Sequence, residues 1–178
     1  INMFGNEKTK DSVIRREFRQ FESSWYSKYK VDRTKERLYR TQYFDAVEIE
    51  TANVPGATDQ IDLNVTMKER NTGKLMLGAG VSSSEGLVGT FTVSQSNFLG
   101  TGNTVSASIS TGEINKTYAL SYTDPYFTDD GIARTVGAYK RDVNTADLST
   151  ATYNTYSYGA NFDFNIPLSE HNGVNLAA

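Results

Sequence analysis

The chain of 178 residues contains no cysteine, three prolines and one histidine. Without cysteine, neither a disulfide framework nor a thiolate metal site is available. His171 lies in the turn-like stretch SEHNG, where we expect a solvated turn residue rather than a metal ligand. The many serines and threonines have no second histidine to act as a base. The sequence therefore predicts no enzyme, no cofactor and no metal site.

Long apolar runs are also absent. No stretch of about eighteen apolar residues occurs, so the sequence contains no transmembrane helix. The mean hydropathy of −0.50 would by itself suggest a water-soluble protein. Strands of a membrane β-barrel, however, alternate lipid-facing and lumen-facing residues, and their mean hydropathy stays low. Transmembrane strands therefore remain compatible with this composition.

Charge divides the chain into two parts. Of 18 basic and 21 acidic residues, 13 and 12 fall in residues 1–70, and 5 and 9 fall in residues 71–178. The first part is a charged, water-soluble type of sequence, and the second is polar but carries few charges. We therefore expect one domain over residues 1–72 and another over residues 73–178. The sequence pI of about 5.2 and the mixed charges give no basic stripe for nucleic acid.

The first part predicts the order strand, helix, helix, strand, strand. The predicted elements are a strand at 1–4, helices at 11–21 and 32–40 (capped by Asp32, with Val31, Leu38 and Tyr39 toward the core), and strands at 44–51 and 60–68. The stretch Val54-Pro55-Gly56 predicts the turn of a hairpin between the last two strands. We expect Trp25 and Tyr26, which connect the helices, to pack over a small core. An uncovered edge of so small a sheet can accept a strand from another chain.

The second part reads as a series of alternating strands. Six runs are predicted, at 74–82, 87–97, 103–111, 116–122, 132–142 and 156–166, and a seventh begins near Val174. Their lengths suit tilted transmembrane strands, of about 9 to 11 residues. Six strands cannot close a barrel, so we expect the full protein to continue past Ala178. A soluble antiparallel sandwich is the alternative, because it permits the same alternation.

Strand parity assigns the loops to two sides. Loops 82–86, 112–115 and 143–154 fall on the far side, and loops 98–102, 124–131 and 167–173 fall on the near side, next to the first domain. The near-side turns carry Phe98, Tyr126 and Phe127, which suits an aromatic girdle at a membrane interface.

The first strand of the second part has recurring glycines. Alternation places Leu75, Leu77, Ala79 and Val81 on one face, and Met76, Gly78 and Gly80 on the other. Glycine inside a strand weakens it and lets another backbone approach closely. The sequence thus predicts a strand that pairs weakly. Relief of crowding inside a curved sheet is the alternative explanation for the glycines.

Several stretches together resemble the BamA family of outer-membrane protein assembly factors. These stretches are RREFRQ (15–20), KERL (35–38), YF (43–44), VPG (54–56), KERNTG (68–73), NFLGTG (97–102) and TDPYF (123–127). The resemblance implies an α+β POTRA domain of βααββ order, followed by an antiparallel transmembrane β-barrel. Only the first six to seven strands of a sixteen-stranded barrel would be present. It also implies the outer membrane of Gram-negative bacteria, with the POTRA domain in the periplasm.

The resemblance also implies a function and its partners. A BamA-type protein is the central subunit of the machinery that folds and inserts outer-membrane β-barrel proteins, by templating strands at a lateral barrel seam. Its partners would be unfolded outer-membrane proteins, periplasmic chaperones, the lipoprotein BamD and other Bam lipoproteins, and the lipid bilayer. Related POTRA–barrel translocators, TamA-like or of two-partner secretion, are the alternative. A plain diffusion porin would lack the first domain.

Two groups of site residues follow from the resemblance. The lateral-seam strand would consist of Lys74, Leu75, Met76, Leu77, Gly78, Ala79, Gly80 and Val81. The lipoprotein-docking residues would be Arg16, Arg19 and Glu22 on the first helix. For these three residues a solvated helix face is the alternative, since exposed charge pairs contribute little to stability.

Overall fold

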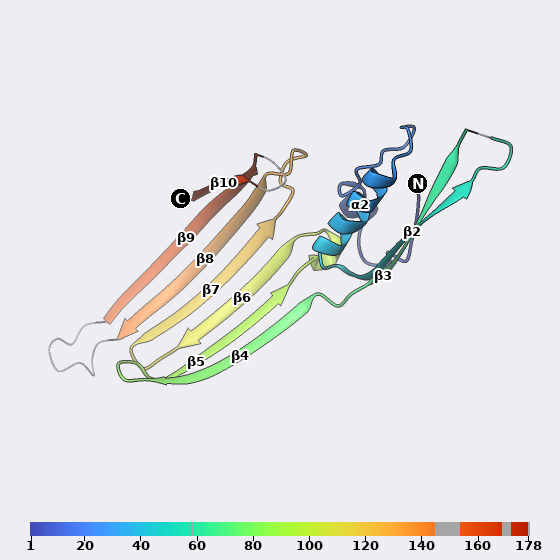
Figure 1. Cartoon of the computed structure of the whole chain (residues 1–178). Coiled ribbons are helices and arrows are strands. Elements are labelled where there is room, and N and C mark those ends of the chain that lie inside the picture. The colour runs from blue at the N-terminus through green and yellow to red at the C-terminus, as the bar shows by residue number, and fades with distance from the viewer. Residues whose placement is uncertain (58, 145–153, 169–171, 178) are drawn as a thin grey trace. The chain divides into compact units, whose positions relative to one another are not determined.

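The computed structural model describes every residue except 58, 145–153, 169–171 and 178. His171 and most of the predicted loop 143–154 therefore lie outside the described residues. The chain forms two units (Figure 1). The first unit is Ile1–Thr72 together with Leu99–Gly102, and the second is Gly73–Phe98 and Asn103–Ala178. Residues 99–102, which the sequence placed in a turn of the strand region, thus belong with the first unit.

The first unit is a small sheet with two helices. Its elements are β1 (Asn2–Phe4), α1 (Asp11–Arg15), α2 (Lys28–Arg40), β2 (Phe44–Asn53) and β3 (Ile61–Glu69). The strands lie in the order β1-β3-β2, with β1 parallel to β3 and β2 antiparallel to it. This is the βααββ order that the sequence predicted.

Among the described residues, no helix is both long enough and apolar enough to cross a membrane.

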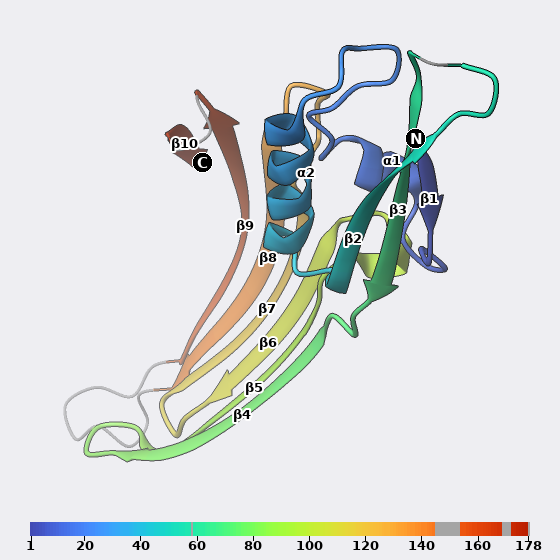
Figure 2. The ribbon, with the colours of Figure 1, turned by 45° about the vertical axis from the view of Figure 1, so that its right-hand side comes forward.

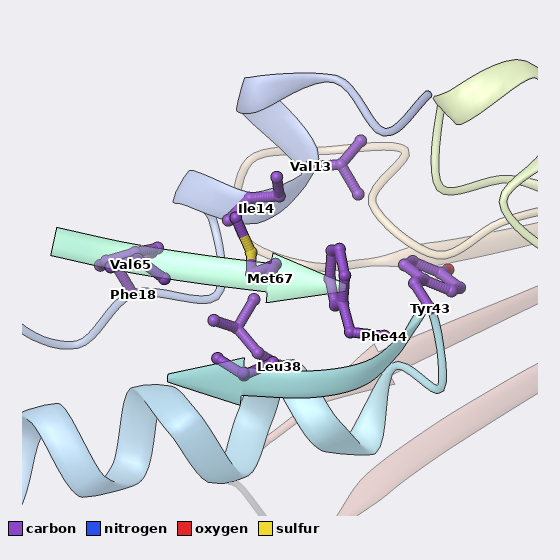
Figure 3. Close-up of a cluster of buried hydrophobic side chains, with 9 residues drawn as sticks. Val13, Ile14, Phe18, Leu38, Tyr43, Phe44, Val65 and Met67 are labelled. Carbon is purple, nitrogen blue, oxygen red and sulfur yellow. The ribbon is translucent and has the colours of Figure 1, made fainter. Parts of the chain in front are cut away.

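One hydrophobic cluster holds the first unit together (Figure 3). It contains Val13, Ile14, Phe18, Leu38, Tyr43, Phe44, Val47, Val65 and Met67. Ile14 comes from α1 and Leu38 from α2, and both are fully buried against the strand residues. Each fully buried aliphatic side chain contributes about 1.5–3 kcal/mol relative to its exposed state. The core therefore fixes both helices on the sheet.

The first helix is shorter than predicted. The sequence predicted residues 11–21, but α1 ends at Arg15 because the backbone beyond it makes tighter turns and then leaves the helical path. The amide of Arg19 donates to the buried hydroxyl of Thr34, at 2.9 Å, rather than to a helical carbonyl. A tertiary hydrogen bond to α2 thus overrides the apolar periodicity that favoured a longer helix.

The second helix begins earlier than predicted. It starts at Lys28 after Ser27, so Asp32 lies inside the helix instead of capping it. Val31 and Leu38 are buried as predicted. Tyr39 is exposed, although its hydroxyl accepts a hydrogen bond from the Val47 amide at 3.1 Å. The tyrosine can therefore lie at the rim, where its ring is solvated and its oxygen is paired.

The second unit is one curved antiparallel sheet (Figure 2). Its strands are β4 (Gly73–Ser82), β5 (Gly86–Gln95), β6 (Thr104–Thr111), β7 (Asn115–Asp124), β8 (Ala133–Asn144), β9 (Asn154–Pro167) and β10 (Gly173–Ala177), with the short helical turn η1 (Phe98–Gly100) after β5. Each strand pairs with its neighbours in sequence, so the sheet is a meander from β4 to β10. All seven predicted strands are present, and the open sheet agrees with a barrel fragment.

The two faces of this sheet differ sharply in polarity. The pairing register aligns large apolar residues across the strands: Leu77 faces Phe91, Phe91 faces Ile109, and Ile109 faces Tyr118. These side chains remain exposed. On the opposite face Ser106 bonds Ser121 at 2.7 Å, and Thr123 bonds Thr135 at 2.9 Å.

This arrangement argues against the sandwich alternative. A sandwich needs a second sheet over the apolar face, and the described part of this unit forms a single sheet. An extensive exposed apolar face marks contact with a membrane or another protein. The polarity of its two faces therefore suits a sheet that separates lipid from a polar interior.

Replacing Thr34 by valine should destabilise the first unit by about 1–3 kcal/mol, because it removes the acceptor of the Arg19 amide. Thr34→Ser keeps the hydroxyl and should cost less. The measurement is the unfolding free energy of the first unit, from hydrogen exchange of its core amides in the intact protein. Equal stability of the valine variant and the wild type would show that the Arg19–Thr34 hydrogen bond does not hold the backbone after α1 in place.

Candidate functional site

The strand β4 forms one edge of the large sheet. It pairs with β5 over its whole length, and its other side has no partner among the described strands. Nine of its ten residues are exposed. An unpaired edge presents backbone N–H and C=O groups to whatever adjoins it. β4 is therefore the first strand and an edge of the described sheet, and it follows the first unit directly in the sequence.

The two glycines of β4 differ in their surroundings. A Cβ added at Gly78 would lie 2.5 Å from the Thr90 hydroxyl oxygen on β5, whereas one added at Gly80 would meet nothing within 4 Å. Relief of crowding therefore explains Gly78 in part. It does not explain Gly80, which lies in open space and simply lacks a side chain for packing.

The apolar face is hollowed beside this edge. A shallow depression of about 390 Å³ lies over β4–β6, and Leu77, Ala79, Gly89, Phe91 and Ile109 contribute to its lining. Gly89 faces Ala79 across the strand pair, so two small residues meet where the flanking pairs carry large side chains. Side-chain packing of β4 against β5 is therefore weak at the Ala79–Gly89 pair.

The far end of β4 is held by a side chain that sequence reasoning missed. Glu85, in the turn after β4, accepts a hydrogen bond from the Asn115 amide at 3.0 Å and another from the Asn115 side chain. The Glu85 carbonyl also accepts from the Glu113 amide at 3.0 Å. The β4–β5 turn is thus fixed to the β6–β7 turn. No sequence pattern marks such a bond between two turns that are thirty residues apart.

Aromatic residues collect near the ends of the apolar face. Phe127 packs edge-on against Phe164, and the Arg134 guanidinium lies 4.0 Å from the Phe127 ring centroid. Near the opposite ends of the strands, the Lys140 ammonium lies 5.9 Å from the rings of Tyr118, Tyr156 and Tyr158, and 2.9 Å from Asp142. Rings with a polar partner at both ends of an apolar band are typical of membrane interfaces. The sequence suggested only the near-side group.

The three predicted docking residues do not share a helix face, because α1 ends before them. Arg16 is half-buried, 3.9 Å from the buried Glu17 carboxylate, which also pairs with Arg37 at 2.8 Å. Arg19 is half-buried too, and its side chain bonds the Phe18 carbonyl. The two arginines therefore hold the connecting loop in place.

Glu22 is the exposed member of the group. Its carboxylate lies 3.0 Å from the Arg15 guanidinium. The hydrogen bond from Arg15 holds the pKa of the Glu22 carboxyl below its ordinary value. Glu22 is therefore charged at neutral pH and accessible to a partner.

The aromatic residues of the connecting loop contradict the prediction. Trp25 is 95% exposed and Tyr26 is 47% exposed, so neither covers the core. The loop is filled by the buried side chain of Gln20, which donates to the Trp25 carbonyl at 3.1 Å and accepts from the Ser27 amide at 3.0 Å. Because a polar side chain satisfies the loop's backbone, the aromatic rings remain outside.

Within the ranges that the structure describes, no three His, Asp or Glu side chains are grouped as metal ligands would be.

Two family models match the chain. A POTRA model, described as a surface antigen variable number repeat, matches residues 1–70, and an Omp85 superfamily domain matches residues 97–178. The two matches follow one another in the same order as the two units of the structure. The chain belongs to the Omp85 superfamily.

Omp85 proteins named BamA are among its relatives. The outer membrane protein assembly factor BamA of Neisseria meningitidis is 40% identical over 178 residues, which is 99% of this chain and 22% of the relative. BamA of Buchnera aphidicola is 30% identical over 99% of the chain and 28% of that protein. The chain thus spans between a fifth and a third of the length of these relatives.

Two solved structures agree with the fold. BamA from Haemophilus ducreyi lacking POTRA domains 1–3 matches 98% of this chain and 33% of that chain, with a TM-score of 0.87 at 37% identity. CdiB from Acinetobacter baumannii matches 93% of this chain and 33% of that chain, with a TM-score of 0.59 at 15% identity, which supports the fold alone. The predicted fold class, an α+β POTRA domain followed by an N-terminal fragment of an antiparallel β-barrel, is confirmed.

The POTRA domain of this Omp85 chain ends in the KERNTG stretch. Its Glu69 carboxylate accepts hydrogen bonds from the Thr9 amide at 2.7 Å and from the Lys8 amide at 3.1 Å. Partial burial alone would raise the pKa of Glu69, but the hydrogen bonds from Thr9 and Lys8 outweigh it, and the pKa is lowered. The charged carboxylate therefore fixes the loop before α1 on the end of β3.

The lowered pKa of Glu69 predicts a pH dependence. Its contribution to the stability of the POTRA domain is fully present above the unfolded pKa of about 4.3 and is lost as the pH falls through the folded pKa. Glu69→Gln should therefore lower the unfolding free energy at pH 7, and the difference from the wild type should shrink in acid. Glu48→Gln, at an exposed position in β2, is the control. A difference that stays constant with pH would contradict this role.

Proposed function

We propose that this chain is part of the central subunit of an outer-membrane β-barrel assembly machinery, which folds and inserts outer-membrane proteins. One observation carries the proposal: a POTRA domain leads directly into a meander of antiparallel strands with one exposed apolar face, and β4 is the first strand of that meander. The identity of 40% to a protein named as an outer membrane protein assembly factor supports it. The role is not enzymatic.

The proposed mechanism rests on hydrogen bonding. In the hydrocarbon region of a membrane each unsatisfied backbone group costs several kcal/mol, so an incoming strand needs a partner before it can enter. The free edge of β4, from Lys74 to Val81, provides donors and acceptors for such a strand by β-augmentation. This strand is the lateral seam, where the substrate is templated.

A template must also release its product. Gly80 adds no side-chain contact, and the Ala79–Gly89 pair contributes little cross-strand packing. Pairing at β4 therefore depends mainly on backbone hydrogen bonds, which a competing strand can exchange for its own. Strand exchange then needs no soluble energy source.

The POTRA domain handles substrate before insertion. It lies in the periplasm, where it receives unfolded outer-membrane proteins from chaperones, while β4–β10 lie in the outer membrane. In the described part of the small sheet, β2 pairs with β3 alone, so its other edge is open to an extended segment of substrate. Backbone hydrogen bonding at a strand edge thus serves both the capture of substrate by the POTRA domain in water and the pairing of substrate strands in lipid.

The lipoprotein BamD and other Bam lipoproteins dock on the loop after α1. Glu22 makes the direct contact, because it is exposed and charged. Arg16 and Arg19 are half-buried and position this loop through Glu17 and the Phe18 carbonyl. The proposal therefore gives one contact residue and two positioning residues in place of one helix face.

Replacing Gly80 by proline should reduce the insertion of outer-membrane proteins several-fold, because proline removes a backbone donor from β4. Adjacent N–H groups of a strand point to opposite edges, so Ala79→Pro removes a donor from the other edge of β4, and the two variants together test both edges. Gly80→Ala is the matched control: it keeps the amide, and its Cβ meets nothing within 4 Å. The measurement is the rate at which a β-barrel substrate folds into vesicles that contain the full-length protein. Normal insertion by both proline variants would exclude the templating role of β4.

Reversing the charge of Glu22 tests the lipoprotein site. Glu22→Lys should lower the amount of lipoprotein that co-purifies with the full-length protein, because it places a cation beside Arg15 where an anion was. Glu36→Lys is the control, since Glu36 also pairs with two arginines but lies on α2. Unchanged co-purification of the Glu22 variant would remove this residue from the interface.

A further inference from the structure

A lysine lies on the apolar face of the large sheet, away from the edge strand β4. Lys140 is in β8, and it faces Tyr118 of β7 and Tyr158 of β9 across neighbouring strand pairs (Figure 1). Alternation along β8 places Lys140 on the same face as Val136 and Ala138. A cation on a lipid-facing surface is costly unless an anion or a polar group lies within its reach. The groups around Lys140 therefore decide its role.

Three tyrosine rings surround the Lys140 ammonium. Its nitrogen lies 5.9 Å from the ring centroids of Tyr118, Tyr156 and Tyr158, within the range of cation–π attraction. The three rings are exposed, and the Lys140 side chain is itself 40% exposed. The rings thus keep the ammonium in one place while it remains accessible from the apolar face.

Cations outnumber anions in this cluster. The Lys140 ammonium donates to the Asp142 carboxylate at 2.9 Å, which uses one of its three donors. Lys116 of β7 lies opposite Asp142 in the register and is exposed. Two lysines and one aspartate leave these three residues with a net charge of +1. The cluster can therefore accept a further anion.

An apolar hollow adjoins the lysine. A shallow depression of about 380 Å³ lies over β6–β9, and Ile109, Leu120, Ala138 and Lys140 contribute to its lining. Ala138 faces Leu120 on β7 and Ala160 on β9, so small side chains lower the surface between larger ones. A hollow that combines an apolar floor with a cation matches an amphiphile, whose hydrocarbon and anion are covalently joined.

We propose that Lys140, its three tyrosines and the hollow at Ala138 bind an anionic membrane lipid with a phosphate headgroup. The phosphate accepts hydrogen bonds from the Lys140 ammonium, and an acyl chain lies in the hollow. Lysine binds phosphate as a compact point charge, and basic residues at a membrane surface attract anionic headgroups. The inference rests on the proposed placement of β4–β10 in the outer membrane, where lipid covers this face.

Lipid retention by the full-length protein tests the site. The protein in detergent is titrated with phosphatidylglycerol or with phosphatidylcholine of the same acyl chains, and the bound lipids are counted by native mass spectrometry. Both lipids can fill the hollow, but the choline cation opposes Lys140. The wild type should therefore bind phosphatidylglycerol several-fold more tightly than phosphatidylcholine.

Substitutions separate a lipid site from a purely structural ion pair. Lys140→Gln should weaken phosphatidylglycerol binding several-fold, whereas Asp142→Asn should strengthen it, because Asp142 competes with the phosphate for Lys140. Ala138→Phe should weaken binding of both lipids, because it fills the hollow. Arg141→Gln is the matched control. It removes the same charge from the next residue of β8, on the opposite face, where Arg141 bonds Asn115 at 3.0 Å, and it should change nothing.

Opposite shifts in Lys140→Gln and Asp142→Asn would support the lipid site. Weaker binding in both variants, unchanged binding in Lys140→Gln or unchanged binding in Ala138→Phe would overturn the inference. Equal binding of the two lipids by the wild type would also overturn it, and this comparison needs no substitution, so it decides even where a variant fails to fold. The titration contains no substrate protein. Failure of the wild type to insert outer-membrane proteins would therefore refute the proposed function and leave the lipid result valid.

Discussion

The pairing of backbone N–H and C=O groups is the constraint on which the large sheet depends. Between β4 and β10 every strand finds its partner in the next strand of the sequence, and the register then fixes which side chains share a face. Because the side chains alternate, one face becomes apolar and the other carries hydroxyl and amide groups. The same constraint underlies the proposed role of β4, the first strand of the sheet.

The POTRA domain is stabilised in a different way from the large sheet. Its stability comes from one buried cluster, and several buried polar groups direct the chain around that cluster. Thr34 turns the backbone away from α1, Gln20 fills the following loop, and Glu17 joins two arginines. Burial of apolar area stabilises the domain, and these hydrogen bonds specify its loops.

Long-range hydrogen bonds also fix turns in both units. Residues 99–102 follow β5 in the sequence and are bonded within the first unit, where the Gly102 carbonyl accepts from Tyr43. In the second unit, the Glu85 side chain joins the β4–β5 turn to the start of β7. Each of these bonds joins residues that are far apart in sequence.

The strands and their faces could be predicted from the sequence alone. Alternation from Lys74 onward and turn residues between the runs were sufficient, because each strand pairs with its sequence neighbour and the relevant signals are local. It also gave the βααββ order and the glycine-rich first strand. The family resemblance suggested the site residues, which remain proposals.

Only the tertiary structure decided where α1 ends, where Trp25 lies and which unit holds residues 99–102. These features depend on contacts between residues far apart in sequence: Arg19 with Thr34, Gln20 with Ser27, and Gly102 with Tyr43. Periodicity cannot report such contacts, because a single long-range hydrogen bond changes the path of the backbone without changing the pattern of apolar residues.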